Sequence, residues 1–189
     1  MEQLPSKTLL RRVLLNQRQA MPVAEWRSKS DRICSHLQSS PLFAQSKTIL
    51  AYFSFRQEPD LSSLFTDTKH DWGFPRCVGK SLIWHKYQAP EPTQKGAYGI
   101  VEPLPEAPLV EPNEVDLILV PAVACDVRGY RLGYGGGFYD RLLSSREWAS
   151  KPTIGIVFEF AYLPELPIDS WDKPLQAVCT DKGLVIGDW

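Results

Sequence analysis

The clearest concentration of residues that could bind a ligand is the glycine-rich segment from Arg128 to Arg141. Five of the chain's 12 glycines lie between Gly129 and Gly137. Glycines let backbone N–H groups approach a ligand closely, and a helix that begins directly after them adds a partial positive charge, which together suit phosphate. Arg128 and Arg131 can each bind phosphate oxygens through two hydrogen bonds. The segment is therefore a candidate phosphate-binding loop.

Spacing alone leaves two interpretations of this segment open. A Walker loop needs Gly-Lys-Ser/Thr, which the chain lacks, and Gly133 to Gly137 begins like GxGxxG but is followed by Phe138 where the last glycine belongs. Asp140, at the expected start of a helix, could hold Mg²⁺ bridged to phosphates or could simply cap the helix. The segment is either a phosphate loop or a glycine-rich turn between a strand and a helix.

The sequence lacks the residue patterns that several other common kinds of catalytic and metal site require. The three histidines, His36, His70 and His85, do not pair at metal-ligand spacing, and no GxSxG motif is present. The four cysteines lie about 45 residues apart without a CxxC pair, which is neither a disulfide framework nor a zinc pattern. This usage indicates a reducing compartment. Any chemistry must rely on carboxylates, Lys, Arg and backbone amides.

The composition is that of one ordinary globular domain, and we assign residues 1–189 to a single domain. The 21 basic and 22 acidic residues give a net charge of −1, which does not steer the chain onto nucleic acid or an anionic membrane. No apolar run reaches the roughly 18 residues of a membrane span, and the N-terminus lacks the apolar core of a signal peptide. We expect a cytoplasmic monomer that acts on a small molecule, with no nucleic-acid or membrane partner.

Hydrophobic periodicity predicts helices that alternate with short apolar strands. The first helix is expected at residues 6–20, with a buried face formed by Leu10, Val13, Leu14 and Gln17. Lys7 and Arg11 are four residues apart and should project from one side of it. Further helices are expected at residues 23–39, 61–68 and 140–148. Strands are expected at residues 48–53, 73–78, 82–87, 115–123 and 153–158, with short edge strands at 178–180 and 184–186.

The order of these elements predicts an α/β fold, in which a mostly parallel sheet is flanked by helices as a Rossmann-like three-layer sandwich. Val115 to Val123 is the most apolar run and should be a central strand. Ligands of such sheets bind outside the carboxyl ends of the strands. Residues 88–113 are rich in Pro and Glu and should form a long functional loop. Its one apolar and aromatic island runs from Tyr98 to Pro103.

The glycine-rich segment also resembles a family signature. Arg131-Leu-Gly-Tyr-Gly-Gly-Gly-Phe-Tyr-Asp140 is similar to the R-x-G-x-G-x-G-x-Y-D motif of 5-formyltetrahydrofolate cyclo-ligases, also called 5,10-methenyltetrahydrofolate synthetases. Further segments resemble the motifs of that family in the same order: Lys7-x-x-x-Arg11, Ser54-x-x-x-Glu58, Tyr98-Gly-Ile-x-Glu-Pro103, Asp116-Leu-Ile-Leu-Val-Pro121 and Leu166-Pro-Ile-Asp-Ser-Trp-Asp172. The resemblance covers nearly the whole chain. It departs at Trp171, where the family often has His, and at Pro59, which should stiffen its turn.

The resemblance implies a ligase that uses ATP and Mg²⁺ to convert 5-formyltetrahydrofolate, including its polyglutamylated forms, into 5,10-methenyltetrahydrofolate. ADP and phosphate would be released. The implied path is attack of the formyl oxygen on the γ-phosphate, formation of an iminium phosphate, and ring closure by N-10. Such chemistry depends on positioning and charge neutralisation more than on a strong base, which suits a chain poor in His.

The resemblance also implies a role for each motif residue. The nucleotide would be bound by Lys7, Arg11, Arg131, Leu132, Gly133, Tyr134, Gly135, Gly136, Gly137, Phe138 and Tyr139. The folate would be bound by Phe53, Glu58, Tyr98, Tyr134, Gly135, Gly136, Gly137 and Phe138. Asp140 and Asp172 would hold Mg²⁺. Arg131 and Tyr139 would act in catalysis, although Tyr139 is equally compatible with a place in the core.

Two other hypotheses remain. A sugar-phosphate isomerase or acyl-CoA transferase on a similar sheet would act without ATP, but the sequence offers no catalytic base beside the glycine loop. A non-catalytic folate-binding protein would bind 5-formyltetrahydrofolate without ATP hydrolysis, and the presence of Lys7, Arg131 and Asp172 disfavours it. Without the resemblance, Lys7 and Arg11 would be interpreted as a solvated helix face and Phe53 as a core residue.

Overall fold

A seven-stranded sheet forms the centre of the computed structural model, which describes residues 5–187. Its strands are β1 (Thr48–Leu50), β2 (Asp71–Val78), β3 (Ser81–Lys86), β6 (Leu117–Pro121), β9 (Thr153–Ile156), β11 (Ala177–Thr180) and β12 (Gly183–Ile186). They lie in the order β12-β11-β9-β6-β1-β2-β3. Neighbouring inner strands pair parallel, whereas the edge strands β3 and β12 pair antiparallel. The predicted α/β class with a mostly parallel sheet is confirmed.

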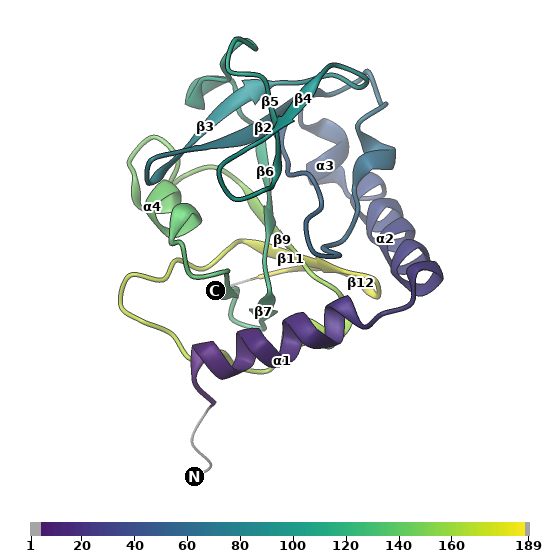
Figure 1. Cartoon of the computed structure of the whole chain (residues 1–189), viewed down its shortest axis with the longest axis vertical. Coiled ribbons are helices and arrows are strands. Elements are labelled where there is room, and N and C mark those ends of the chain that lie inside the picture. Colours follow the sequence, from purple (N-terminus) through teal and green to yellow (C-terminus); the bar gives the residue numbers. More distant parts are fainter. Residues whose placement is uncertain (1–4, 188–189) are drawn as a thin grey trace.

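Helices cover the sheet and one of its ends (Figure 1). Their bounds are α1 Lys7–Gln19, α2 Val23–Gln38, α3 Pro41–Gln45 and α4 Phe138–Ser144, with 3-10 turns η1 Ser62–Leu64, η2 Pro112–Glu114 and η3 Glu159–Ala161. α1 lies across the lower end of the sheet in Figure 1, where β6 ends. Within residues 5–187, no helix is long and apolar enough to cross a bilayer.

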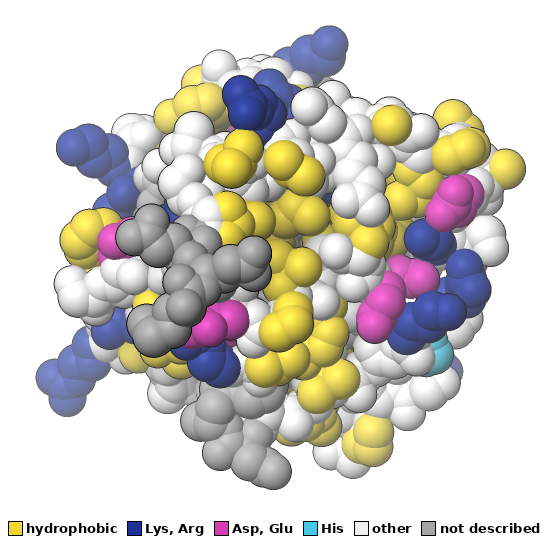
Figure 2. Space-filling model, turned by 90° about the horizontal axis from the view of Figure 1, so that it is seen from below, with side chains coloured by type: hydrophobic (Ala, Val, Ile, Leu, Met, Phe, Trp, Pro, Cys, Tyr) yellow, Lys and Arg dark blue, Asp and Glu magenta, His cyan; other side chains and the backbone are white. Residues whose placement is uncertain are grey.

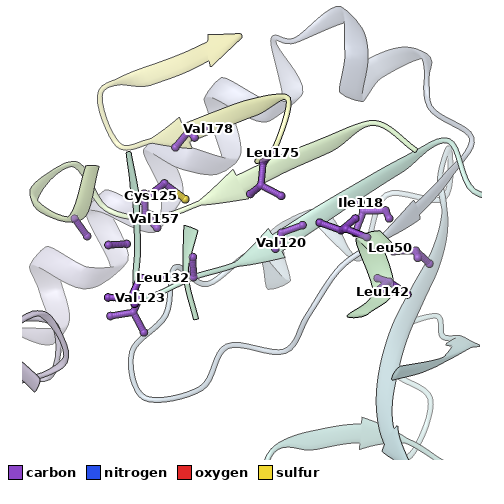
Figure 3. Close-up of a cluster of buried hydrophobic side chains, with 14 of the residues drawn as sticks. Leu50, Ile118, Val120, Val123, Cys125, Leu132, Leu142, Val157, Leu175 and Val178 are labelled. Carbon is purple, nitrogen blue, oxygen red and sulfur yellow. The ribbon is translucent and has the colours of Figure 1, made fainter. Parts of the chain in front are cut away.

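Alternating residues of β6 divide the core into two clusters on opposite faces of the sheet. Leu117 and Leu119 pack in the cluster that contains Ile33 and Leu37 of α2. The intervening residues of β6 pack in the other cluster, part of which is shown in Figure 3, together with Leu142 of α4. Side chains on successive strand residues point to opposite faces, so both faces of this sheet are buried beneath helices. The arrangement is the expected three-layer sandwich.

Two smaller sheets extend from the central sheet and carry loops of the candidate site. β7 (Ala124–Asp126) pairs antiparallel with β8 (Arg131–Leu132) and parallel with β10 (Tyr162–Leu163). The long loop predicted for residues 88–113 contains an antiparallel ribbon of β4 (Thr93–Lys95) and β5 (Val101–Pro103). The loop prediction missed this ribbon because its strands are short.

Several predicted bounds are wrong in ways that have local causes. The helix expected at residues 61–68 is only the η1 turn, because the Asp67 carboxylate accepts a hydrogen bond from the Lys69 N–H at 2.9 Å and turns the chain. Its apolar residues imitate helical spacing because they pack into the core. α4 begins two residues earlier than expected, after Gly137 at φ 65°. β11, expected at an edge, is an inner strand with β9 as its parallel neighbour, whereas β12 does lie at an edge.

The buried face expected for the first helix is only partly right, because Leu10 and Leu14 pack in the core and Val13 and Gln17 do not. Val13 is 51% exposed, whereas Arg18 is 3% exposed. The helix is rotated because it turns Lys7, Arg11 and Arg18 toward the sheet end rather than toward solvent. Figure 2, seen from the α1 side, accordingly shows hydrophobic side chains on the surface of this face.

Candidate active site

A cavity of about 680 Å³ opens at the end of the sheet that α1 covers. This volume lies within the usual range for small-molecule sites. Its wall is built from α1, the segment after β1, strands β2 and β3, the Tyr98–Glu102 loop, the glycine-rich segment and the Asp169–Asp172 loop. The cavity therefore lies at the carboxyl ends of β1 and β6, where the fold class places ligands.

All the site residues that the family resemblance implies line this one cavity, whereas Arg128, also expected to bind phosphate, does not line it and pairs with Asp126 and Glu165 instead. The implied residues are Lys7, Arg11, Phe53, Glu58, Tyr98, Arg131, Leu132, Gly133, Tyr134, Gly135, Gly136, Gly137, Phe138, Tyr139, Asp140 and Asp172. They come from five separate stretches of the chain, so their convergence is a property of the fold rather than of sequence proximity. Their individual roles stay predictions.

One charged cluster links the start of α1 to the Asp169–Asp172 loop. Lys7 Nζ lies 2.7 Å from Asp169 Oδ2 and 2.5 Å from Asp172 Oδ2. The Asp169 N–H also donates to Asp172 Oδ2 at 2.7 Å. Partial burial opposes the charge of Lys7, but hydrogen bonds and attraction from the two carboxylates outweigh it and raise the pKa of Lys7. The ammonium therefore stays charged in the cavity.

A second charged pair joins β8 to α4. Arg131 Nη2 lies 2.9 Å from Asp140 Oδ1. The contact is an ion pair without good hydrogen-bond geometry, so the buried Nε and Nη2 of Arg131 have no hydrogen-bond partner among residues 5–187. The guanidinium also lies over the Tyr139 ring, 5.4 Å from its centroid. Buried donors without partners are costly, so an anion that accepts from Arg131 would satisfy them.

The glycine-rich loop has backbone conformations that glycine adopts more easily than any other residue. Gly135 has φ 101° and Gly137 has φ 65°, conformations that disfavour a side chain. Arg11 Nε donates to the Gly133 carbonyl at 2.7 Å. Arg141 Nη2 donates to the Gly136 carbonyl at 2.7 Å. The loop is thus held from both sides while its backbone faces the cavity.

The opposite part of the wall is aromatic and carries one buried carboxylate. Phe53 stacks on Phe74 at 4.2 Å between ring centroids. Glu58 is 3% exposed. Burial raises the pKa of Glu58 to about 7, and Arg18 together with hydrogen bonds from the Phe55 N–H and the Tyr134 hydroxyl limits the rise. This wall suits a flat, amide-like ring that offers hydrogen-bond donors.

Two further aromatic residues have contrasting environments. Tyr98 is 58% exposed at the cavity mouth, with its ring edge-on to Phe138 at 5.8 Å. Tyr139 is partly buried, and its hydroxyl oxygen is inaccessible to solvent and has no hydrogen-bond partner within the described chain. Burial raises the pKa of Tyr139 well above its ordinary value. Tyr139 therefore keeps its proton and has a donor available to a bound group.

Sequence reasoning missed several residues of the site. Arg18 contacts Tyr134 and influences Glu58, and its spacing from Arg11 on the same helix could have revealed it. Glu102 and Asp169 line the cavity inside motifs that were recognised, but no role was assigned to them. Glu102 is buried and accepts from Arg76 Nε at 3.2 Å. Trp171 also lines the cavity, in the same motif as Asp169, and Cys77 lines it without any motif or spacing that points to it.

The carboxylates do not form a ready-made metal cage. Across residues 5–187, no group of three or more His, Cys, Asp or Glu side chains is arranged to hold a metal ion. Asp140 and Asp172 both line the cavity, but each is paired with a cation. Mg²⁺ is commonly held by one or two carboxylates together with substrate phosphates. The donor set therefore fits Mg²⁺ that arrives with a nucleotide.

Known proteins resemble this chain over almost its whole length. The profile of the 5-formyltetrahydrofolate cyclo-ligase family matches residues 3–181. The 5-formyltetrahydrofolate cyclo-ligase of Mycolicibacterium smegmatis is 33% identical over 192 residues, covering 96% of each chain. That of Haemophilus influenzae is 32% identical over 163 residues, covering 86% of this chain and 76% of the relative.

Solved structures agree with the sequence comparison. The structure of Aquifex aeolicus 5,10-methenyltetrahydrofolate synthetase superposes with a TM-score of 0.85 at 35% identity and covers 95% of this chain and 92% of its own. The synthetase from Mycoplasma pneumoniae superposes with a TM-score of 0.75 at 23% identity, which supports the fold. With the family profile, the relatives and the cavity in agreement, the chain belongs to the 5-formyltetrahydrofolate cyclo-ligase family, a family of ligases.

Proposed function

We propose that this protein closes 5-formyltetrahydrofolate to 5,10-methenyltetrahydrofolate at the expense of ATP, through an iminium phosphate. The observation that carries the proposal is the convergence of a cationic cluster and an aromatic wall with one carboxylate on a single cavity. The cationic cluster suits phosphates and the aromatic wall suits a pterin. A reaction that joins a nucleotide to a folate needs both in one place.

The phosphates of ATP would lie against Lys7, Arg11, Arg131 and the glycine-rich loop. Arg131 offers buried donors that lack partners, and an anion would satisfy them. Backbone N–H groups of the loop can approach phosphate oxygens because glycines carry no side chains. Lys7 would leave Asp169 and Asp172 for a phosphate, exchanging one set of anionic oxygens for another.

Asp140 and Asp172 would hold Mg²⁺, together with phosphate oxygens. The ion would neutralise charge on the phosphates during transfer. In the same exchange, Arg131 and Lys7 would lose their carboxylate partners and would be free to bind phosphate. Before the ligands bind, each carboxylate thus occupies the position of a phosphate beside a cation, and each cation occupies the position of Mg²⁺ beside a carboxylate.

The pterin would lie on the aromatic side, with Phe53 as part of the wall and Glu58 accepting hydrogen bonds from the amide-like edge of the ring. Tyr98 at the mouth would cover the ligand. Glu58 accepts best when ionised, so its pKa of about 7 places the change of charge near neutral pH.

The chemistry would proceed in two balanced steps. The formyl oxygen attacks the γ-phosphorus, a new P–O bond forms, the bond to the β-phosphate oxygen breaks, and ADP leaves. The N-5 lone pair becomes a C=N bond in the iminium phosphate. N-10 then attacks this carbon and loses its proton to the departing phosphate or to water. The C–O bond breaks, and phosphate leaves with the formyl oxygen.

Arg131 and Tyr139 would serve the transferred phosphoryl group. Arg131 is placed to neutralise its charge, and the buried Tyr139 hydroxyl is a donor without a partner in the described residues. Preorganised donors in a buried site stabilise developing charge because they need no rearrangement during the reaction. All these side chains come from one chain, and we propose that a monomer is the active form.

The test is an assay of the purified protein with 5-formyltetrahydrofolate, ATP and Mg²⁺. The methenyl product absorbs in the near ultraviolet, and one ADP should form for each product molecule. Turnover without ATP would favour the isomerase or transferase hypothesis. Binding of the folate without product or ADP would indicate a non-catalytic relative.

A further inference from the structure

Arg18 joins three separate parts of the cavity wall without lining the cavity itself. It lies near the end of α1 and is 3% exposed. Its Nε donates to the Arg56 carbonyl at 3.0 Å, and its Nη1 donates to the Ala122 carbonyl at 3.3 Å. Its Nη2 donates to the Tyr134 hydroxyl. One buried guanidinium thus ties α1 to the turn after β1, to the end of β6 and to the glycine-rich loop.

The turn that Arg18 holds is strained. Arg56 and Gln57 have φ 49° and 55°, a left-handed conformation that is costly for residues with a side chain. Such strain persists only where the surroundings impose it, and it is concentrated at functional sites. Gln57 adds to the restraint. With its amide oriented so that the nitrogen meets hydrogen-bond acceptors, that nitrogen donates to the Arg18 carbonyl at 2.7 Å. Hydrogen bonds therefore hold the strained turn against the end of α1.

The turn ends in Glu58, which lines the cavity. Glu58 Oε2 accepts from the Phe55 N–H at 3.1 Å, inside the same turn. The Glu58 carbonyl accepts from the Trp26 indole N–H at 2.9 Å, which links the turn to α2. The Tyr134 hydroxyl, held by Arg18, also reaches the Glu58 carboxylate. The position of this carboxylate therefore depends on contacts that meet at Arg18.

We propose that Arg18 is a positioning residue, which fixes the strained turn and the Tyr134 hydroxyl so that Glu58 presents its carboxylate to the folate. The proposal rests on the proposed function for the identity of the ligand. It divides α1 into two parts with separate tasks. Lys7 and Arg11 at its start serve the nucleotide, whereas Arg18 at its end serves the folate through Glu58.

The kinetic test compares Arg18→Met and Arg18→Lys with Arg12→Met, an exposed arginine on the same helix. Misplacement of a binding group by a small distance commonly costs about tenfold to a hundredfold. Arg18→Met should raise KM for 5-formyltetrahydrofolate by that factor and change KM for ATP less than about threefold. Arg18→Lys should fall between Arg18→Met and the wild type, because one ammonium cannot reach all three acceptors. Equal effects on both KM values, or kinetics equal to those of Arg12→Met, would overturn the proposal.

A second measurement needs no activity and separates this proposal from the proposed function. The Trp26 indole N–H signal in a ¹⁵N NMR spectrum, assigned with Trp26→Phe, reports the hydrogen bond to the Glu58 carbonyl. Arg18→Lys should shift that signal, whereas Arg12→Met should not. An unshifted signal in a folded Arg18→Lys protein would overturn the positioning role even if the enzyme is active. If the signal shifts but the protein does not bind folate, Arg18 still positions the Glu58 turn, and the proposed function is wrong.

Discussion

Lys7 Nζ lies 2.5 Å from Asp172 Oδ2, so a cation expected to bind phosphate and a carboxylate expected to hold metal are paired with each other. Arg131 and Asp140 form a second pair of the same kind, 2.9 Å apart. In each pair the two charges neutralise each other. Nucleotide and metal together can replace both partners at once, whereas either one alone leaves a charge unpaired. We therefore expect ADP to bind much more tightly with Mg²⁺ than without it.

Replacing Lys7 by Met should weaken nucleotide binding. A hydrogen bond to a charged group contributes about 1.5–3 kcal/mol, so KM for ATP should rise about tenfold to a hundredfold, with little change in KM for the folate. Stability should change by about 1 kcal/mol or less, because the ion pairs are partly exposed. Lys29→Met is the matched control, since Lys29 is 20% exposed, compared with 21% for Lys7, and pairs with Glu25 on α2. Equal kinetic effects of the two substitutions would contradict the phosphate role.

Replacing Asp140 by Asn should reduce turnover far more than stability. Loss of a group that stabilises transferred charge commonly costs about 100-fold or more in kcat. The pair with Arg131 is largely buried, with 4% and 20% of the two side chains exposed, so Asn is chosen because it keeps a neutral oxygen beside Arg131 and costs less stability than a truncation. Binding of Mn²⁺ with ADP, followed by electron paramagnetic resonance, should weaken in the same variant. Asp31→Asn on the exposed face of α2 serves as the control. Near-wild-type kinetics and Mn²⁺ binding would assign Asp140 to capping the helix instead.

Glu58 should make the stability of the protein depend on pH. Its pKa rises from 4.5 to about 7 on folding, so the folded protein holds a proton that the unfolded chain loses between these values. This group therefore lowers the free energy of unfolding as pH rises from about 4.5 to 7, by up to about 3 kcal/mol, and adds no further change above pH 7. Relative to wild type, Glu58→Gln should gain stability over that window. Urea unfolding at pH 5 and pH 8 measures it, and a pH-independent difference would show that the pKa of Glu58 is not raised.

Gly137 and Gly79 test whether the shape of the glycine loop matters for the nucleotide. Both have positive φ, 65° and 60°, so an alanine costs roughly 1–2 kcal/mol of stability at either position. Gly79 lies in the β2–β3 turn, and a Cβ there would meet nothing within 4 Å. Gly137→Ala should raise KM for ATP in addition to lowering Tm, whereas Gly79→Ala should only lower Tm. If neither variant changes KM, the loop does not bind the nucleotide.

The sequence was sufficient for the middle of the sheet, because β1, β6 and β9 are apolar runs that are buried on both faces. Val115 to Val123 was expected as a central strand, and β6 lies between β1 and β9. The spacing of apolar residues gave a wrong prediction where residues buried from a turn happen to have the period of a helix. Leu61, Leu64 and Phe65 are spaced as in a helix, yet each packs into the core from a single turn. Local polar contacts, such as that of Asp67, decide such cases and leave no periodic pattern.

The residues of the candidate site could be predicted from motifs, but the contacts between those residues could not. The resemblance assigned site roles to particular motif residues, and the fold brings all of those residues to one cavity. The burial of Arg18 on α1 was missed because hydrophobic periodicity assigns arginine to solvent, whereas Arg18 is buried against carbonyl groups. The pairing of Lys7 with Asp172 was also unforeseen, since 165 residues separate them. Contacts between distant segments have no signature in a single sequence.

The most direct test of the account is the fate of the formyl oxygen. Substrate labelled with ¹⁸O in the formyl group is incubated with the protein, unlabelled ATP and Mg²⁺, and the released phosphate is analysed by ³¹P NMR. If the formyl oxygen attacks the γ-phosphate, each phosphate released with methenyl product carries one ¹⁸O. Product formed with unlabelled phosphate would contradict the phosphorylated intermediate, and with it the proposed reaction of this cavity.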